Sequence, residues 1–175
     1  MTLGALPCAV YDRGVSFLPP DFEPPVLETE RFRLRSLTVH DVVKDYDAVM
    51  TSREHLWELF GEAWGWPPAD LTLEEDLIDL GWHQKEFQRR STFAYAVMNL
   101  DETRLLGCVY VDPPTKRGYD AEVTWWVRSS ELASGLDDDL GETVRTWIAN
   151  AWPFSQVAYP GRDITWSEYK GPRDR

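Results

Sequence analysis

Apolar side chains recur along this chain with two different periods, and the periods predict where helices and strands lie. Spacings of three and four residues predict helices over about residues 38–60, 72–90 and 137–152. Alternation of basic and apolar residues predicts a half-buried strand over residues 31–35. Apolar runs rich in β-branched and aromatic residues predict three further strands, at residues 92–100, 105–111 and 121–128.

Local signals place the ends of several of these elements. Thr38 with Asp41 is a plausible helix start, and Thr72 with Glu75 has the spacing of a capping box at the start of the second helix. Residues 101–103, Asp-Glu-Thr, make a turn between two strands. The first two strands of the central group are therefore predicted to form a hairpin.

The two ends of the chain differ from this regular centre. Five prolines within residues 1–25 favour an irregular N-terminal arm, and residues 26–175 are then expected to form one domain. After Trp152 the tail has two short strand candidates, residues 155–159 and 164–169, and no further helix is predicted there.

Composition narrows the class of protein. With 175 residues, 43% hydrophobic and 27% charged, the chain is long enough to fold as one soluble domain without disulfides or metals. Its formal charge of -12 argues against nucleic acid and anionic membrane as partners, because both attract basic surfaces. A cationic small molecule or a basic peptide is the expected type of partner.

Cysteine and histidine usage points to no special chemistry. Cys8 and Cys108 lie far apart, which indicates neither a disulfide framework nor a metal cluster. His40, His55 and His83 lack metal-ligand spacing, so no metal site is expected. Since the chain has no signal-peptide pattern and no run of membrane-spanning length, a cytoplasmic location is predicted.

Three segments resemble a known superfamily. Residues 27–35 read Leu-Glu-Thr-Glu-Arg-Phe-Arg-Leu-Arg, residues 107–111 read Gly-Cys-Val-Tyr-Val, and residues 121–127 read Ala-Glu-Val-Thr-Trp-Trp-Val. Together with the element order, they resemble the GNAT superfamily of N-acetyltransferases, near the branch of ribosomal-protein N-terminal acetyltransferases. The resemblance covers about residues 27–152. It implies an α+β fold in which a mixed, mostly antiparallel sheet splays apart between flanking helices, with acetyl-CoA in the V-shaped gap.

The resemblance also implies roles for individual residues. Backbone amides around Trp126 and Val127 would orient and polarise the thioester carbonyl. Glu122 is the candidate base for the acceptor amine, although a carboxylate on a strand is also expected as a surface residue or ion-pair partner. Tyr159 is the candidate acid, with Tyr169 as the other late tyrosine. Contacts to the cofactor are expected from Trp126, Val127, Arg128, Ala133, Ser134, Gly135 and Leu136.

The phosphate loop departs from the superfamily's pattern of Gln or Arg, two residues, Gly, one residue, then Gly or Ala. Leu132 and Asp137 stand at its first and last positions, and three aspartates, residues 137–139, open the following helix. One aspartate facing a phosphate ~5 Å away would repel it by about 1–3 kcal/mol. That repulsion offsets the ~0.3–1 kcal/mol that a helix N-terminus offers. Successive helical side chains diverge, so the three acids cannot all point one way, and Asp137 is predicted to be the N-cap.

Four aromatic residues between the first two predicted helices have two interpretations. Trp57, Phe60, Trp64 and Trp66 lie where the superfamily builds one wall of its acceptor site, but core packing is the more ordinary role for such residues. Trp64 and Trp66 are the stronger substrate-binding candidates, because aromatic residues in a Gly-Pro loop often line pockets.

Two functions therefore stay open from the sequence. The first is transfer of acetyl from acetyl-CoA to an amine of a small molecule or a protein N-terminus. The second is a non-catalytic binding module that keeps the fold without efficient CoA binding, which the acidic loop and short tail favour. A symmetric homodimer is a general expectation for a chain of this kind.

Overall fold

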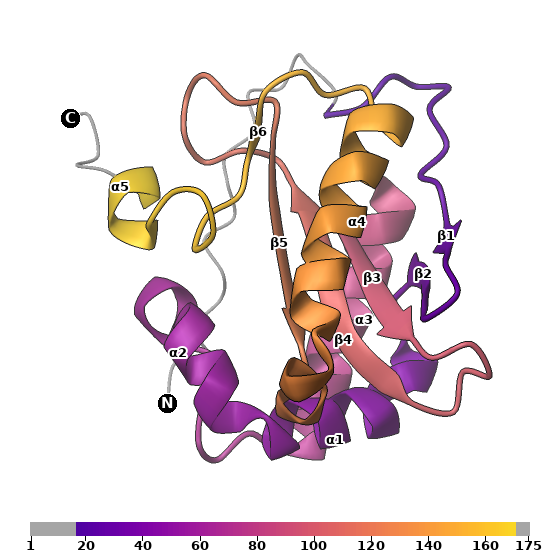
Figure 1. The fold of residues 1–175 in the computed structure, drawn as a ribbon, viewed down its shortest axis with the longest axis vertical. Coiled ribbons are helices and arrows are strands. Elements are labelled where there is room, and N and C mark those ends of the chain that lie inside the picture. The colour runs from indigo at the N-terminus through magenta and orange to yellow at the C-terminus, as the bar shows by residue number, and fades with distance from the viewer. Residues whose placement is uncertain (1–16, 171–175) are drawn as a thin grey trace.

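The computed structural model describes residues 17–170, which form one sheet flanked by helices (Figure 1). Six strands lie side by side in sequence order: β1 (Leu27–Glu28), β2 (Arg33–Ser36), β3 (Phe93–Met98), β4 (Leu105–Asp112), β5 (Ala121–Val127) and β6 (Val157–Ala158). The first five pair antiparallel, and β6 pairs parallel to β5. The predicted α+β fold with a mixed, mostly antiparallel sheet is confirmed.

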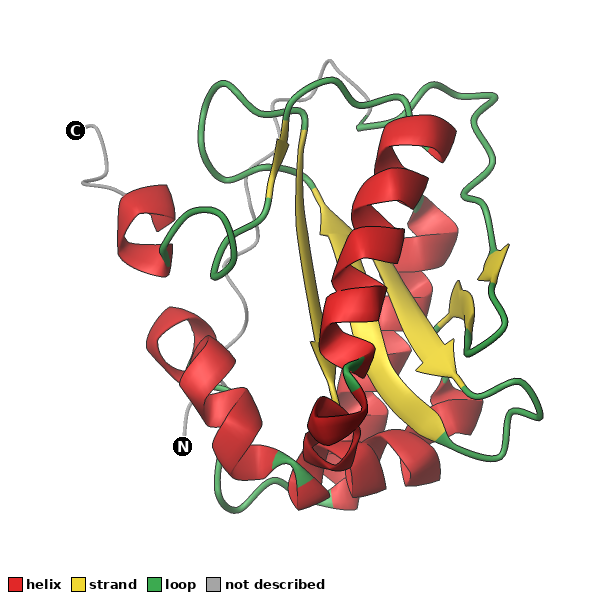
Figure 2. Cartoon of the chain, viewed as in Figure 1, coloured by secondary structure: helices red, strands yellow, loops and turns green. Residues whose placement is uncertain are grey.

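The longer helices pack against both faces of this sheet (Figures 1 and 2). One face packs against α4 (Leu136–Ala151), and the other against α1 (Val42–Thr51), α2 (Arg53–Trp64) and α3 (Leu73–Arg89). Three short segments complete the description: η1 (Val39–Asp41), η2 (Ser129–Ser134) and α5 (Trp166–Lys170). We call the two sides of the sheet the α4 face and the α1–α3 face.

Strand β5 is covered on both of these faces. All seven of its residues are buried. Val123, Trp125 and Val127 belong to the core under α4, whereas Trp126 belongs to the core under α1 and α2. Because side chains alternate along a strand, Glu122 and Thr124 also point to the α1–α3 face. A carboxylate and a hydroxyl are therefore placed on the buried α1–α3 face of β5.

Two predicted helix boundaries differ in outcome. The capping box at the start of α3 is confirmed, since Thr72 Oγ1 accepts from the Glu75 amide at 3.2 Å and Glu75 accepts from the Thr72 amide at 2.9 Å. The single helix predicted over residues 38–60 is instead split into η1, α1 and α2. The break comes at Ser52, whose Oγ accepts a hydrogen bond from the distant Ser129 amide at 3.0 Å.

The tail contains a helix that the sequence analysis did not predict. Residues 164–169 were expected as a strand, but α5 begins at Trp166. Thr165 and Glu168 form a capping box at its start, with the Thr165 amide 3.1 Å from the Glu168 carboxylate. Burial of Trp166 and Tyr169, three residues apart on one side of the helix, holds it against the domain.

The described part of the N-terminal arm packs on the domain without regular structure up to β1, while residues 1–16 lie outside the described residues. Leu18 is fully buried, and the ring of Phe17 stacks 5.2 Å from that of Phe154. Arg90 donates to the Pro19 carbonyl at 3.0 Å. The domain core therefore includes residues on both sides of the predicted boundary at residue 25.

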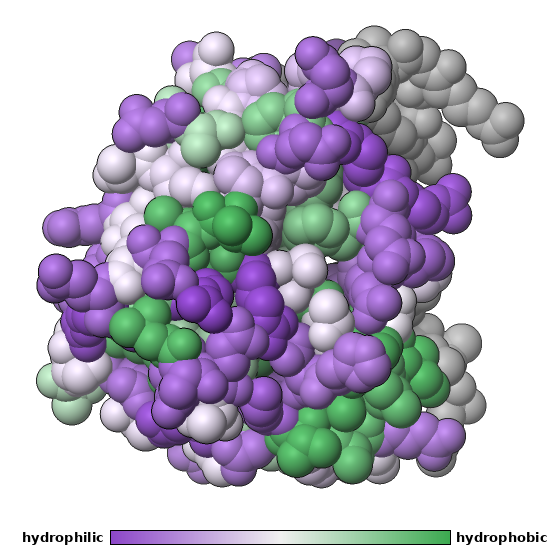
Figure 3. Space-filling view, turned by 90° about the vertical axis from the view of Figure 1, so that its right-hand side faces the viewer, coloured by the Kyte–Doolittle hydropathy of each residue, from purple (hydrophilic) through white to green (hydrophobic). Residues whose placement is uncertain are grey.

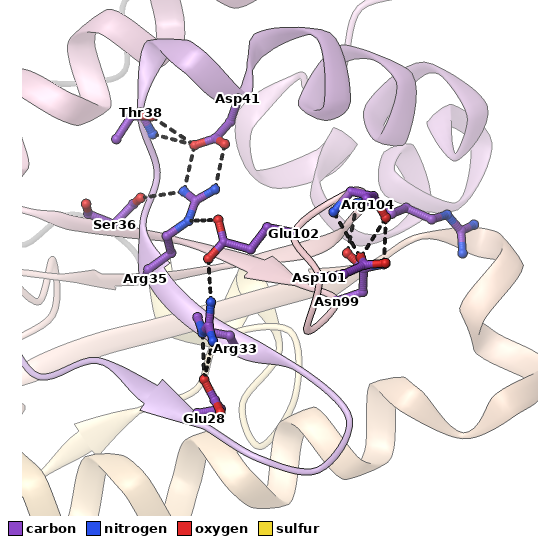
Figure 4. A network of polar contacts seen from close by, with 11 residues as sticks. Glu28, Arg33, Arg35, Ser36, Thr38, Asp41, Asn99, Asp101, Glu102 and Arg104 are labelled. Atoms are coloured by element: carbon purple, nitrogen blue, oxygen red, sulfur yellow. Dashed lines mark hydrogen bonds and ion pairs between the residues drawn. The ribbon is translucent and has the colours of Figure 1, made fainter.

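The alternating arginines of β2 form a polar ladder (Figure 4). Arg35 makes a two-point ion pair with Asp41 at 2.8 Å, and Glu102 bonds both Arg33 and Arg35 at 2.8 and 2.9 Å. Glu28 of the neighbouring strand bonds Arg33 at 2.7 Å. These contacts give the basic residues of the predicted strand a structural role, tying β2 to η1 and to the β3–β4 turn.

Figure 3 shows that the side of the molecule next to β1 and β2 is largely hydrophilic, with separate hydrophobic patches. Large apolar side chains exposed over the described surface include Val26, Val43, Leu73, Leu77, Ile78 and Trp82. None of the described helices is long and apolar enough to cross a membrane.

Candidate active site

Strands β5 and β6 touch only at one end and then part. They pair at Ala121 with Val157 and at Glu122 with Ala158. Farther along β5, the Arg128 amide bonds the Leu106 carbonyl of the β4 side at 2.8 Å. Since antiparallel bonding alternates along a strand, the amides of Arg128 and Trp126 face β4, and the amide of Val127 faces away from it. Of the two amides predicted to contact the thioester, Val127 is the one directed to the gap.

Arg162 of the tail occupies this gap. Its Nη2 lies 3.3 Å from the Trp125 carbonyl, and its guanidinium binds Asp137 at 2.6 and 2.9 Å. The guanidinium also lies over the Trp125 ring, 4.6 Å from its centre. Nothing in the local sequence marks Arg162 for this position, because the contact joins the tail to two elements at least 25 residues away.

The start of α4 is free of side-chain capping. The N-cap residue is Gly135, which has a positive φ of 73°, and no side chain caps the first amides of the helix by a hydrogen bond. The prediction that Asp137 is the N-cap is wrong, since its carboxylate turns to Arg162. Asp139 forms an ion pair with Arg31 from the β1–β2 turn, and Asp138 is exposed. The three acids diverge as predicted, and two of them are neutralised by arginine.

The remaining predicted cofactor residues fall into two groups. Ala133 and Ser134 lie exposed in η2 just before α4, with the Ser134 hydroxyl donating to the Glu131 carbonyl at 2.8 Å. Leu136 is buried in the core, and Arg128 points to α1, where it bonds Asp47 at 2.6 Å. A side chain added at Gly135 would meet no atom within 4 Å. The space beside Gly135 is therefore open, whereas Arg128 is bonded to Asp47.

Glu122, the predicted base, is buried at 8% exposure and held by three donors. Its Oε2 accepts from the Tyr169 hydroxyl at 2.8 Å and from the amide and hydroxyl of Thr115 at 3.1 and 3.0 Å. Asp112 of β4 stands directly opposite Glu122 in the strand register. The base candidate therefore lies beside a second carboxylate and is not an outward surface residue.

The structure brings Tyr169 to Glu122 and does not bring Tyr159 there. Tyr159 follows β6 on the α4 face, where Arg145 lies 4.2 Å above its ring and the Trp125 ring centre is 6.1 Å away. Burial raises the pKa of Tyr159, and burial together with the Glu122 carboxylate raises that of Tyr169. Of the two late tyrosines, Tyr169 is the one in contact with the candidate base.

Further acids gather beside Glu122 on the α1–α3 face. Burial and the charge of Glu122 raise the pKa of Asp112 to about 7. Burial and the charge of Asp79 raise that of Asp76 to about 6, and burial and Asp76 raise that of Asp45. No linear motif announced this group, because its members come from α1, α3, β4 and β5.

His83 is the histidine within this acidic group. Burial by itself would lower its pKa, but Asp79, 3.6 Å away, together with the charges of Asp112 and Asp76, raises it. Among the described residues, no three His, Cys, Asp or Glu side chains are placed to hold a metal ion.

The predicted substrate aromatics form a wall beside these acids. Trp64 stacks on Phe60 with 4.5 Å between ring centres and meets the edge of Trp166 at 5.2 Å. Trp66 lies 6.2 Å from the fully buried Trp126, whose Nε1 donates to the Tyr110 hydroxyl at 3.3 Å. Trp64 and Trp66 are both half-buried. The Trp64 ring centre also lies 6.5 Å from that of Tyr110, which lies 5.4 Å from the His83 ring centre.

Similarity to known proteins is found by structure and not by sequence. No family model matches the sequence, and no curated protein matches it. Solved structures do match over about three quarters of the chain. The ribosomal-protein-S5-alanine acetyltransferase from Vibrio fischeri is 18% identical with a TM-score of 0.59, and the match covers 77% of this chain and 72% of that one.

The chain has the GNAT fold. RimL, a ribosomal L7/L12 alpha-N-protein acetyltransferase solved with coenzyme A, is 15% identical with a TM-score of 0.58, over 71% of this chain and 68% of that one. A spermidine N-acetyltransferase from Vibrio cholerae, solved with CoA and spermine, is 12% identical with a TM-score of 0.54, over 74% and 70%. At these identities the likeness concerns the fold, and the GNAT-like domain's own chemistry has to be argued from its residues.

Proposed function

We propose that this GNAT-fold protein transfers an acetyl group from acetyl-CoA to an amine. The observation that carries the proposal is the parting of β5 and β6 next to the uncapped start of α4. That arrangement offers the Val127 amide to a thioester and helix amides to a pyrophosphate. Solved structures with this fold include acetyltransferases bound to CoA, which supports the same use of the gap here.

The chemistry requires few protein groups. The acceptor ammonium gives a proton to a base, its nitrogen forms a bond to the thioester carbonyl carbon, and the carbon–sulfur bond breaks. The departing sulfur then takes up a proton. Glu122 is the base within this framework and Tyr169, bonded to it, is a group that can relay or supply a proton. Asp137 and Asp139, neutralised by Arg162 and Arg31, repel a pyrophosphate less than free aspartates would.

Calorimetry with acetyl-CoA tests the proposal. We expect binding with a dissociation constant in the micromolar range, and a rise in melting temperature that corresponds to about 2.7 kcal/mol at 100 times that constant. Addition of an amine should then release free CoA thiol, measured with a thiol reagent. Absence of binding at millimolar acetyl-CoA would exclude acetyl transfer by this protein.

A second candidate function is a binding module that does not use CoA, and Arg162 favours it. Its guanidinium fills the gap by contacts to both the Trp125 carbonyl and Asp137. If this contact closes the gap permanently, Arg162→Ala should create CoA binding that the wild-type protein lacks. If the contact opens for the cofactor, wild type and variant should both bind CoA, within about tenfold of each other. Lys116→Ala, which removes a tail contact outside the gap, is the matched control.

A further inference from the structure

Helix α3 presents large apolar side chains to solvent as well as to the core. Leu80 is buried under the helix at 1% exposure, whereas Ile78 and Trp82 are 62% and 51% exposed. Because a helix turns by ~100° per residue, Ile78 and Trp82 each lie ~160° around the helix from Leu80. Packing within residues 17–170 therefore does not account for an isoleucine and a tryptophan on this outer side.

Helix α1 lies beside α3 and widens the exposed apolar surface. The Val39 amide, just before α1, donates to Gln84 Oε1 at 3.0 Å. The Tyr46 hydroxyl donates to the Leu71 carbonyl at 3.0 Å. Val43 is four residues after Val39 and three before Tyr46, on the same side of α1, and it is 69% exposed. Contiguous apolar surface of this kind is typical of a contact site for another molecule.

Charged side chains stand at both ends of the outer side of α3. Glu74 lies in the first turn and Arg89 in the last, and both are exposed. Neither forms an ion pair with another residue between 17 and 170. These charges suit the dipole of α3 itself, but the dipole gives no reason for the apolar Ile78 and Trp82 between them.

Residues three or four apart form one row along this side, which we call the outer row: Glu74, Ile78, Gly81, Trp82, Lys85 and Arg89. The outer row is complementary to itself when a second copy lies antiparallel. With a two-fold axis between Gly81 and Trp82, Glu74 of each copy comes level with Arg89 of the other. A parallel arrangement would instead put each charge beside its own kind.

The middle of the outer row also fits this arrangement. The same axis brings Gly81 of each copy level with Trp82 of the other. A Cβ at Gly81 would meet only Val39 within 4 Å, at 3.8 Å, so the helix surface is low where the indole ring arrives. Ile78 comes level with Lys85, whose methylene chain can pack on it while the ammonium stays in water.

We propose that the outer row is the interface of a reversible homodimer in which two copies of α3 pack antiparallel. The 17 residues of α3 span ~25 Å, and a helix is ~10 Å wide. A dimer held mainly by this helix buries less than the ~800 Å² per partner of a standard interface. We therefore expect a dissociation constant on the order of 10 µM. The proposal does not depend on acetyl transfer.

Sedimentation equilibrium of the full chain tests the proposal. Salt at about 0.15 M screens the long-range repulsion between two chains of charge -12 and leaves close ion pairs in place. The mean mass should rise from one chain to two chains as the concentration passes through about 10 µM. A protein that stays monomeric at about 200 µM would overturn the proposal, since a second copy would then not cover the outer row.

Ile78→Ser tests the apolar part of the outer row. It should weaken dimerisation at least about tenfold, because the lost apolar contact occurs twice in a two-fold dimer. Val26→Ser is the matched control, since Val26 is 72% exposed and lies before β1, away from α3. Val26→Ser should leave the dissociation constant unchanged. Equal weakening by both variants would place the contact elsewhere and overturn the proposal.

Exchange of the two end charges tests the antiparallel register. Glu74→Arg alone and Arg89→Glu alone should each weaken dimerisation about tenfold, because each sets like charges opposite one another at both ends. The double variant restores opposite charges and should return the dissociation constant to within about threefold of wild type. A purely structural role of either residue in its own helix would give no such rescue. A double variant that dimerises as weakly as the single variants would refute the antiparallel pairing of α3.

Discussion

Replacement of Asp112 by asparagine should stabilise the protein above neutral pH. Asp112 faces Glu122 across the β4–β5 pair and His83 from α3, and burial with the Glu122 charge raises its pKa to about 7. In an unfolded chain the pKa of an aspartate is ~3.9. The folded state therefore binds the proton more tightly, and stability is lost as pH rises from about 4 to about 7.

The size of this loss follows from the two pKa values. A difference of about three pKa units corresponds to at most about 4 kcal/mol of unfolding free energy above pH 7. Asparagine has the same shape and no charge to desolvate. Asp112→Asn should therefore gain about 1–4 kcal/mol at pH 8 and about zero at pH 4.

Urea denaturation of wild type and variant at pH 4, 6 and 8 measures this difference. The midpoint of Asp112→Asn should move to higher urea as pH rises relative to wild type, with an unchanged denaturant slope. Asp70→Asn, at an exposed position, should change stability by less than about 0.5 kcal/mol at every pH. A variant that is less stable than wild type at pH 8 would refute the reasoning, because it would mean that the charged form of Asp112 is satisfied in the folded protein.

Three further substitutions test the packing around the site. Thr72→Ala removes the capping hydrogen bond of α3 and should lower the free energy of unfolding by about 1 kcal/mol in denaturant titrations; no change would mean that the cap is dispensable. Gly107→Ala places a Cβ 1.9 Å from the Trp126 carbonyl oxygen and should cost about 3 kcal/mol or more, measured as a fall in melting temperature; a small effect would mean that β4 and β5 can separate there. Tyr169→Phe removes one donor to Glu122 and should cost about 1 kcal/mol, whereas the control Tyr159→Phe, on the other face of the sheet, should cost less; equal losses would contradict the assignment of Tyr169 to Glu122.

Sequence periodicity predicted the elements whose contacts are local or strictly periodic. The β3–β4 hairpin and the α3 capping box depend on neighbouring residues, and both were found where the pattern indicated them. The helix in the tail was missed although a signal was present. Thr165 and Glu168 have the same spacing as Thr72 and Glu75, but residues 164–169, which include Trp166 and Tyr169, were interpreted as a strand candidate.

The site itself was less predictable because its contacts join distant segments. Glu122 was found through its strand, and the burial of that strand on both faces follows from its apolar composition. Arg162, Asp112 and His83 carried no local pattern, since each acts on residues from other elements. The prediction that Asp137 is the N-cap of α4 was wrong because its carboxylate forms an ion pair with Arg162 of the tail instead. A local pattern does not show a contact with a residue 25 positions away.

Two groups of acids in this fold have opposite pKa shifts and therefore opposite effects on stability at neutral pH. Asp41 and Glu102 lie in the ladder of Figure 4, where arginines outweigh burial at Asp41 and lower the pKa of both carboxyls. Asp76 and Asp112 lie on the α1–α3 face, where burial and neighbouring acids raise their pKa. The first group stabilises the fold at neutral pH, and the second destabilises it. A sheet face that only needed packing would be more stable with apolar residues at these positions.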